Sequence, residues 1–398
     1  MTTEILIVSW NGRDDALRAI ESVHPQIGSG SGRVPDTTIT LVDNGSTDHT
    51  AESVQRRFPA VRIVRLPENR GFTGGIGAGL AGSSADQVIF LNNDAVVEPG
   101  WLQALTNELS EAPEDVIAVS GRIVDMSGDR ADFIGGVITF DGHGFQPGYH
   151  KPLADVVEPE TGDEILFACG GNMIVRREEF VTIGGFDDDY FAYFEDVDFG
   201  WRARLSGHRI IYSREAVARH RSAATSNRLG DFERGVLFEK NAAMTALKNL
   251  DEDVFQQMSA SIFLTLLHRE HRYLVDRTNH GGLLSRPPLG EPGPAPRSWW
   301  NRIGDSMRKS RLRLDDPLAV MQIRATEWIL KNMDTIMKKR AGVQSLRKVS
   351  DREIFGRFPM AIVPTYPGDE KLFASTLFNM LGPVLPAERR FLDELIER

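Results

Sequence analysis

Cysteine is almost absent from this chain of 398 residues, which holds only Cys169. A lone cysteine excludes an internal disulfide and a cysteine-based zinc cluster, and it is typical of a reducing compartment. No uncharged apolar run approaches the roughly 18–20 residues of a membrane span. The first residues lack the basic leader, long apolar stretch and cleavage site of a signal peptide. These absences predict a cytoplasmic protein that does not cross a membrane.

Positive charge is also in short supply, with 46 Lys+Arg against 56 Asp+Glu and a net charge of −10. Such a balance argues against a nucleic-acid partner. The charge is uneven, however, because residues 297–352 hold 14 lysines and arginines and 6 acidic residues. A basic helical segment favours peripheral contact with anionic lipid or with a polyanionic acceptor. It is equally consistent with a solvated helix face or a contact between subunits of a homo-oligomer.

The first hundred residues alternate strand and helix signals. Short runs rich in Val, Ile and Leu predict four strands, at Glu4–Ser9, Thr38–Val42, Val61–Leu66 and Gln87–Leu91. Helices are expected near 14–23 and 48–57, the second with Ser46 or Thr47 as its N-cap. This rhythm indicates an open, mostly parallel sheet, which binds ligands beyond the carboxyl ends of its strands. Asp43 and Asp94 fall at such ends and should face one crevice.

The length of the chain predicts more than one structural unit. We expect a catalytic α/β domain over residues 1–230, a helical extension over 231–284, a proline-rich linker over 285–297 and a helical C-terminal region over 298–398. Prolines exclude a regular helix from the linker. The pair Trp299–Trp300 lies next to basic residues, so it would suit an interfacial membrane anchor or pack against the catalytic domain or a second subunit.

Three carboxylates crowd into four positions at Glu195–Asp198, after an aromatic run. We expect them at the start of a helix that ends near Gly207, where the helix dipole keeps carboxylates ionised. Asp198 and Arg202 are four residues apart and can pair across one turn. Asp196 would then remain available to accept a proton from a sugar hydroxyl.

Three further polar positions have both a functional and a structural interpretation. Asp94 closes the segment Leu91–Asp94 and can hold a divalent cation that neutralises a diphosphate, or it can cap a turn. His220 can ligate the same cation or be a structural histidine. Asp43 can hydrogen-bond a base or ribose, or belong to an ordinary βα turn.

A glycine-rich stretch at Glu68–Gly79 predicts a loop whose backbone could approach phosphates closely. It is not a dinucleotide fingerprint, because that fingerprint should follow the first strand. The first strand is followed instead by Trp10–Asp14, which has no glycine cluster. An NAD site is therefore excluded from the prediction.

Taken together and in this order, these segments resemble the family 2 glycosyltransferases, which have the GT-A fold. The matching stretches are Val8–Asn11, Val42–Ser46, Glu68–Phe72, Leu91–Asp94, Gly184–Asp187 and Phe194–Asp198. The resemblance covers about residues 1–225 and is nearest to rhamnosyltransferase-like members that build bacterial cell-surface polysaccharides. It implies an α/β fold with a Rossmann-like mixed sheet flanked by helices, followed by a mostly helical C-terminal region.

The resemblance also implies an inverting transfer from a nucleotide-diphosphate sugar, such as dTDP-rhamnose or a UDP-sugar, to a glycan or lipid-linked acceptor. A divalent cation, Mn²⁺ or Mg²⁺, would assist. Asp196 would be the general base with Glu195 beside it, and Asp94 and His220 would hold the metal. The implied donor-binding residues are Ser9, Trp10, Asn11, Asp43, Asn69, Arg70, Asn92, Asn93 and Asp94. The implied acceptor-side residues are Gly170, Gly171 and Trp201.

Two positions depart from the family pattern. Asn92 stands where the usual motif has its first acid, and Ile76–Gly77 stands where a pair of asparagines is frequent. A catalytically weak sugar- or nucleotide-binding module therefore remains an alternative. A nucleotidyltransferase is a second alternative, although the first strand–helix turn has no basic phosphate-binding signature.

Overall fold

A twisted mixed sheet forms the centre of the N-terminal half in this computed structural model, which describes residues 1–221, 230–275, 317–366, 368–382 and 384–395. Its strand order is β3-β2-β1-β4-β10-β6-β11-β5, with β7 paired to β6. The strands are β1 Thr3–Ser9, β2 Thr37–Asn44, β3 Arg62–Leu66, β4 Gln87–Asn92, β5 Ala95–Val97, β6 Val116–Asp125, β7 Ala131–Phe133, β10 Asn172–Arg176 and β11 Arg209–His220. Two small pairs stand apart, β8 Val137–Ile138 with β9 Gly144–Phe145, and β12 Met360–Ile362 with β13 Ala387–Arg389.

The four strands expected from the first hundred residues are confirmed, and they run parallel to one another. The sheet as a whole is mixed, because β10 lies antiparallel between β4 and β6. Along β1 the side chains alternate between two cores, since Leu6 packs on one face and Ile5 and Ile7 on the other. Both faces are covered, which explains the nearly continuous apolar runs of these strands.

Six helices accompany the sheet in the described part of the N-terminal half: α1 Arg13–Val23, α2 Thr50–Arg57, α3 Gly71–Leu80, α4 Trp101–Glu111, α5 Arg177–Thr182 and α6 Glu195–Leu205. The expected cap of the second helix is wrong. Its N-cap is His49, in the left-handed conformation, and the Asp48 carboxylate accepts the Thr50 N–H at 3.1 Å. Ser46 instead accepts the Asn11 N–H and so joins two loops.

The glycine-rich stretch is largely helical, which corrects the expectation of a phosphate-binding loop. Helix α3 lies against the sheet, and two of its glycines, Gly75 and Gly79, face the strands. A Cβ atom on Gly75 would lie 2.5 Å from Val8 Cγ1, and one on Gly79 would lie 3.1 Å from Val42 Cγ2. These glycines therefore allow a helix to pack unusually close to β1 and β2, and that role explains them without a ligand.

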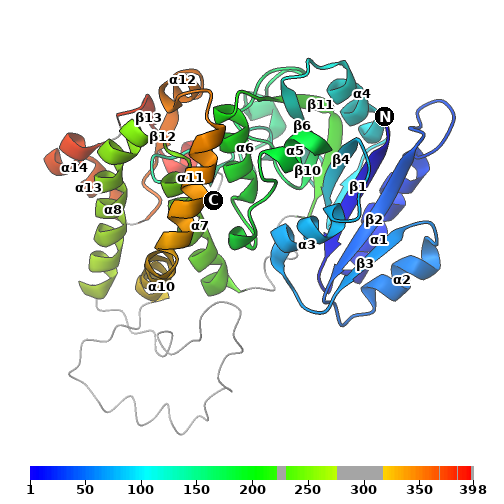
Figure 1. Cartoon of the computed structure of the whole chain (residues 1–398), viewed down its shortest axis with the longest axis horizontal. Helices are drawn as coiled ribbons and strands as arrows, with labels where there is room; N and C mark the ends of the chain where they lie inside the picture. Colours follow the sequence, from blue (N-terminus) through cyan, green and yellow to red (C-terminus); the bar gives the residue numbers. More distant parts are fainter. Residues whose placement is uncertain (222–229, 276–316, 367, 383, 396–398) are drawn as a thin grey trace, which may run out of the picture.

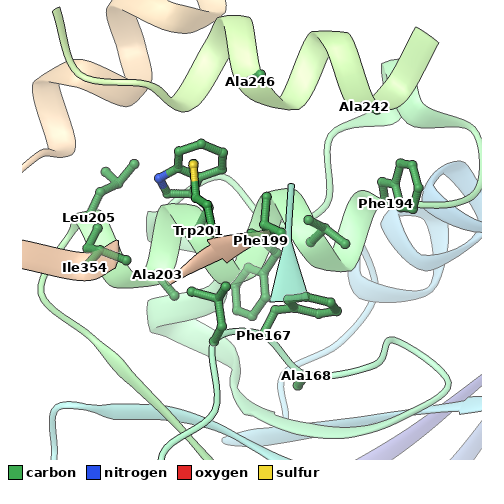
Figure 2. Packing of buried hydrophobic residues seen from close by; sticks show 14 of the residues in the cluster. Phe167, Ala168, Phe194, Phe199, Trp201, Ala203, Leu205, Ala242, Ala246 and Ile354 are labelled. Atoms are coloured by element: carbon green, nitrogen blue, oxygen red, sulfur yellow. The ribbon is translucent and has the colours of Figure 1, made fainter. Parts of the chain in front are cut away.

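The C-terminal half is mostly helical and shares a core with the sheet (Figure 1). Its helices are α7 Asp231–Asn249, α8 Glu252–Val275, α10 Pro317–Lys331, α11 Met333–Leu346, α12 Asp351–Arg357, α13 Asp369–Phe373, α14 Thr376–Leu381 and α15 Leu392–Leu395. One hydrophobic cluster runs from Leu6 and Phe90 of the sheet to Ile336 of α11 and Phe355 of α12. Figure 2 shows Trp201 and Leu205 of α6 beside Ile354 of α12, with α7 lying across α6. No helix of the described residues is long and apolar enough to span a membrane.

The proline-rich linker 285–297 and Trp299–Trp300 lie outside the described residues. The basic segment is described from Pro317 onwards, and part of its charge is used internally. Arg340 is buried and donates to the Leu247 carbonyl at 3.0 Å, while Lys339 pairs with Asp189 at 2.6 Å. These cations join α11 to α7 and to the loop before α6, so they are not part of a basic surface.

A buried ionic cluster ties the segment 139–145 to the C-terminal helices. Arg269 of α8 lies 3.1 Å from Asp141, 3.4 Å from Glu239 and 2.9 Å from Asp369. His143 completes the cluster, 3.2 Å from Asp141 and 3.0 Å from Glu239. All five side chains are buried, so removing one partner would leave an unpaired charge in the interior.

The last described residues also support this segment. The Leu395 carbonyl accepts the N–H groups of Gly148 at 2.8 Å and Tyr149 at 3.1 Å. The Leu395 side chain is buried in a small cluster that includes Phe145. The end of the chain thus packs behind residues 145–149.

Candidate active site

A cavity of about 690 Å³ opens beyond the carboxyl ends of β1, β2 and β4. Asp94 and Asp196, which are 102 positions apart in the numbering, both line it, as the sequence predicts. Most of the site residues expected from the sequence are found here. Those that line the cavity are Trp10, Asn69, Asn92, Asn93, Asp94, Gly170, Gly171, Glu195, Asp196 and His220.

Strand pairing places His220 next to Asp94. In the β11–β5 pair His220 lies opposite Ala95, the residue that follows Asp94. His220 Nε2 is 3.1 Å from Asp94 Oδ1, and its Nδ1 is 2.9 Å from Asp132 Oδ2. The imidazole is therefore held between two carboxylates. Burial disfavours the imidazolium, but the hydrogen bonds with Asp132 and Asp94 outweigh burial and raise the pKa of His220 to about 10.

This arrangement fits a divalent cation held by few protein ligands. The described residues contain no cluster of three or more His, Cys, Asp or Glu side chains that could hold a metal by themselves. Asp94 and His220 are suitably close, and Asp132 orients the histidine through Nδ1 so that Nε2 faces Asp94. A bound cation would replace the Nε2 proton of the imidazolium, because only the neutral imidazole ligates a metal. Two protein ligands leave most of the coordination shell to diphosphate oxygens and water, as is common for Mg²⁺.

Asn92 occupies the position where the family pattern has an acid. Its Nδ2 is 3.3 Å from His220 Nε2, and its backbone N–H donates to the Gly171 carbonyl at 3.1 Å. A Cβ atom on Gly171 would lie 2.5 Å from Asn92 Nδ2, so any larger residue there would displace the Asn92 side chain. Asn92 is thus tightly packed between His220 and the Gly170–Gly171 bend.

The Gly170–Gly171 bend also contacts Asp196, the general base expected from the sequence. The Asp196 carboxylate accepts the Gly170 N–H at 3.0 Å and the Val197 N–H at 2.8 Å. Helix α6 begins at Glu195, as expected, and Asp198 pairs with Arg202 at 2.8 Å. Asp196 lines the cavity, whereas Asp198 is paired with Arg202, as the sequence predicts.

Burial opposes the expected effect of the helix dipole at two of the three carboxylates, Glu195 and Asp196. Burial raises the pKa of Asp196, although the two N–H donors partly offset it. For Glu195, burial and the neighbouring Asp196 charge raise the pKa further, and Glu195 Oε2 has no partner in the described structure. Since Asp196 has two donors and Glu195 Oε2 has none, a proton shared between them resides on Glu195. Only Asp198 has a lowered pKa, because Arg202 and Lys248 outweigh its burial.

Four of the expected donor residues lie outside the cavity lining. Ser9 accepts the Asn93 amide at 3.1 Å, and the Asp43 carboxylate accepts the Ser46 N–H at 3.0 Å, so both support residues beside the cavity. Asn11 accepts the Thr47 N–H at 2.7 Å. Arg70 extends toward Asp188, at 4.0 Å. The expectation that Asp43 shares the crevice with Asp94 is therefore not met by the described lining.

Trp201 also differs from its expected place on the acceptor side. Its indole is fully buried and donates to Asp351 at 2.9 Å. Its ring packs edge-on against Phe355 at 5.0 Å. The residue faces the C-terminal helices because it lies five positions after Asp196 on α6, on another side of the helix.

Several lining residues were not identified from the sequence. They are Asn44, Asp132, Phe145, Tyr149, Tyr193, Arg234 and Phe238. Asn44 belongs to the quoted Val42–Ser46 stretch, and its amide donates to Asn69 Oδ1 at 2.9 Å. Tyr193 belongs to the aromatic run before Glu195. Asp132, Arg234 and Phe238 carry no local signal, because only strand pairing and helix packing bring them to the cavity.

Comparison with known proteins agrees with this geometry. Residues 4–184 match the model of Glycosyl transferase family 2. An N-acetylglucosaminyl-diphospho-decaprenol L-rhamnosyltransferase of Mycobacterium tuberculosis is 28% identical over 214 residues, 48% of this chain and 68% of that protein. The O-antigen biosynthesis protein RfbC of Myxococcus xanthus is 28% identical over 230 residues, 55% of this chain but 17% of its own length.

Among solved structures, GalNAc-T7 with UDP, GalNAc and Mn²⁺ aligns with a TM-score of 0.49 and 16% identity, covering 66% of this chain and 51% of that one. The sheet, its acidic cavity and the family match together define a glycosyltransferase. Residues 4–184 are thus similar to glycosyl transferase family 2, and the chain is similar to rhamnosyltransferases.

Proposed function

We propose that this protein is an inverting, metal-dependent glycosyltransferase of cell-surface polysaccharide synthesis. It moves a sugar from a nucleotide-diphosphate donor, such as dTDP-rhamnose or a UDP-sugar, to a hydroxyl of a glycan or lipid-linked acceptor. The observation that carries the proposal is the shared cavity. It brings Asp94, which lies beside His220, together with Asp196, a half-buried carboxylate at the start of a helix. The names of the relatives agree with this substrate class.

The donor occupies the side of the cavity formed by the ends of β1, β2 and β4. Trp10, Asn69 and Asn93 offer an aromatic face and amide groups to the nucleoside. Asp94 and His220 hold Mn²⁺ or Mg²⁺, which when bound neutralises negative charge on the diphosphate. Asp132 keeps the imidazole of His220 oriented.

Asp196 acts as the general base in a single displacement. It takes the proton of the acceptor hydroxyl as that oxygen forms a bond to the anomeric carbon from the face opposite the diphosphate. The bond from the anomeric carbon to the diphosphate oxygen breaks, and the nucleoside diphosphate leaves with that electron pair. A raised pKa makes Asp196 a stronger base than an exposed aspartate, and Glu195 retains its proton beside it.

Replacement of the base tests this mechanism. Asp196→Asn should lower the rate of transfer by about 10²–10⁴-fold, the usual contribution of a general base, and leave donor affinity measured by calorimetry nearly unchanged. Asp253→Asn, at an exposed position of α8, is the matched control and should retain full activity. Substantial activity in the Asp196 variant would exclude it as the base.

The two alternative functions differ in what they release. A binding module without catalytic activity would not release nucleoside diphosphate from a nucleotide sugar with Mn²⁺ or Mg²⁺, whereas a transferase hydrolyses its donor slowly. A nucleotidyltransferase would release pyrophosphate from a nucleoside triphosphate. The donor itself is identified by thermal shift with a panel of nucleotide sugars, because a bound ligand raises apparent stability.

Membrane contact is a separate part of the proposal. We propose a cytoplasmic protein that touches the inner face of the membrane through its basic segment 297–352. Since Lys339 and Arg340 of α11 are used internally, the test replaces only the arginines and lysines of residues 297–313 by glutamine. Flotation with anionic liposomes should decrease in this variant, and equal flotation of both proteins would remove the membrane contact from the proposal. Light scattering of the same samples tests the expected homo-oligomer.

A further inference from the structure

The backbone immediately before α6 is strained. Phe191 has φ 65° and ψ −60°, and the Ala192 N–H donates to the Tyr190 carbonyl at 2.7 Å. These values describe a γ-turn of the rare, strained kind. Tyr193 and Phe194 also have positive φ, at 70° and 64°, which is unfavourable for bulky residues. Strain of this kind persists only where the surroundings hold the backbone, and it is concentrated at functional sites.

One side chain of α7 holds this strained backbone. Asn241 is fully buried. Its Nδ2 group donates to three carbonyls of the segment, those of Tyr190 at 3.1 Å, Ala192 at 2.8 Å and Tyr193 at 2.7 Å. Since carbonyls only accept hydrogen bonds, the amide is fixed with its nitrogen toward the segment. Asn241 Oδ1 is buried and has no hydrogen-bond partner in the described part of the chain, so the orientation that serves the segment has a cost.

Other side chains of α7 hold the beginning of the segment. The hydroxyl groups of Thr245 and Tyr190 are 2.7 Å apart. Lys248 pairs with Asp187 at 2.7 Å. These contacts lie before the γ-turn, whereas the hydrogen bonds of Asn241 reach beyond it. Asn241 therefore decides how the last residues before α6 lie.

The backbone that Asn241 holds leads directly to the general base. Tyr193 lies three positions before Asp196, which is the second residue of α6. The Asp196 carboxylate accepts the N–H of Gly170 at 3.0 Å, and Gly170 belongs to a distant part of the sequence. A change of the backbone at Tyr193 would turn the first turn of α6 and carry the carboxylate away from this N–H.

We propose that Asn241 is a positioning residue for the general base, because it holds the backbone of residues 190–194 in the conformation that brings Asp196 to Gly170 and to the acceptor hydroxyl. This inference rests on the proposed function, since it concerns the base of that reaction. Without the hydrogen bonds of Asn241 the segment relaxes toward negative φ. The base is then displaced, and its charged form loses one hydrogen-bond donor.

The only cysteine of the chain reports on this contact without any substrate. Cys169 precedes Gly170 and lines the cavity. Burial and the charge of Asp196 raise the pKa of its thiol, so the wild type should react slowly with dithiobis-nitrobenzoate. Asn241→Leu keeps the branched shape of the side chain but has no donor, and it should accelerate this reaction about 10- to 100-fold. Asn241→Ser keeps one donor and should give a smaller acceleration.

Thr265→Val is the matched control. Thr265 of α8 is also fully buried and donates to the Ser261 carbonyl at 2.8 Å, so this variant loses a buried hydrogen bond outside the segment. Its thiol reaction should proceed at the wild-type rate. All the variants should keep a cooperative urea transition. Loss of that transition in both Asn241 variants would overturn the inference, because Asn241 would then hold the whole fold and not the base.

Hydrolysis of a nucleotide sugar with Mn²⁺ separates positioning from stability. With the member of the panel that the wild type hydrolyses fastest, Asn241→Leu should lower kcat about 10- to 100-fold and leave KM for the donor nearly unchanged. Loss of the Gly170 donor should also move the acid limb of the pH–rate profile to higher pH, because the base then binds its proton more tightly. An unchanged thiol reaction or an unchanged acid limb in Asn241→Leu would overturn the inference. Absence of hydrolysis by the wild type would instead contradict the proposed function, and the thiol reaction would still test the position of Asp196.

Discussion

Glu195 and Asp196 are adjacent in the sequence, but their carboxyl groups meet different surroundings. Asp196 accepts two backbone N–H groups, whereas Glu195 Oε2 is buried without a partner. The difference assigns the proton to Glu195 and the charge to Asp196. Sequence alone identified both residues and placed them at a helix start, where the helix dipole favours the charged form, so it predicted ionisation of both.

The pH dependence of stability tests the burial of Glu195. A group with a raised folded-state pKa binds its proton more tightly when folded, so its stabilising contribution is complete at acid pH and is lost as the pH rises through the folded pKa. The loss amounts to about 1.4 kcal/mol per pH unit between the unfolded and folded pKa values. Glu195→Gln removes this dependence. Urea unfolding from about pH 5 to pH 7 should show the variant gaining stability relative to the wild type as the pH rises.

Glu114→Gln, at an exposed position, is the control for this series and should follow the wild type at every pH. A difference between Glu195→Gln and wild type that stays constant with pH would show that Glu195 is ionised in the folded protein throughout the range.

The role of Asp132 could not be predicted from the sequence. It lies on β7, and only the pairing of β7 with β6 brings it to His220. Asp132→Asn should weaken Mn²⁺ binding in the presence of UDP by about 10–100-fold, as outer carboxylates of metal-bound histidines do. Calorimetry measures this, with Asp129→Asn, an exposed neighbour, as control. An unchanged Mn²⁺ affinity would exclude His220 and Asp132 as a metal-binding pair.

At the scale of helices and strands, the local pattern predicted most of the N-terminal half. The four parallel strands and the helix start at Glu195 were expected, since apolar periodicity and strand-end punctuation depend on neighbouring residues only. The failures occurred where a distant contact decides. His49 occupies the N-cap position of α2, although Ser46 and Thr47 are better cap residues. The side chains of Ser46 and Thr47 are instead hydrogen-bonded to Asn11. Helix α3 forms in a glycine-rich stretch because the glycines allow close packing on β1.

A pair of glycine substitutions tests this account of α3. Gly75→Ala should lower the free energy of unfolding by about 1–3 kcal/mol, because the new methyl group would lie 2.5 Å from Val8. Gly342→Ala on α11 is the matched control, since no atom lies within 4 Å of its added Cβ. There we expect a gain of about 0.5–1 kcal/mol from helix propensity. Denaturant titration measures both, and equal effects would contradict the packing argument.

At the scale of the whole molecule, the sequence predicted the class of the chain but not how its halves meet. The order of the motifs indicated that Asp94 and Asp196 share a crevice, and this is confirmed. Helical periodicity in the C-terminal half identified helices, but periodicity does not say which partner each apolar face contacts. Trp201 was misplaced for that reason, since its partners Asp351 and Phe355 are about 150 residues away.

The shared core predicts how the protein unfolds. The expected boundary at residue 230 crosses the cluster that links Phe90 to Ile336, and Arg269 joins α8 to Asp141 of the N-terminal half. Scanning calorimetry should therefore show one cooperative transition, with equal calorimetric and van't Hoff enthalpies. Residues 1–230 produced alone should bind a hydrophobic dye and lack a sharp transition. Two separate transitions in the full chain would mean that the halves fold independently.

The support of residues 145–149 by the last described turn has a consequence for how such enzymes diversify. In the proposed function the donor binds at the ends of the sheet strands, whereas another wall of the cavity depends on residues 145–149, on α7 and on the backing that Leu395 gives to Tyr149. Substitutions at residues 145–149, on α7 and at Leu395 would thus alter which molecule is decorated and leave the activated sugar the same. Exchange of these three segments between two such proteins would give hybrids with the donor of one parent and the acceptor of the other.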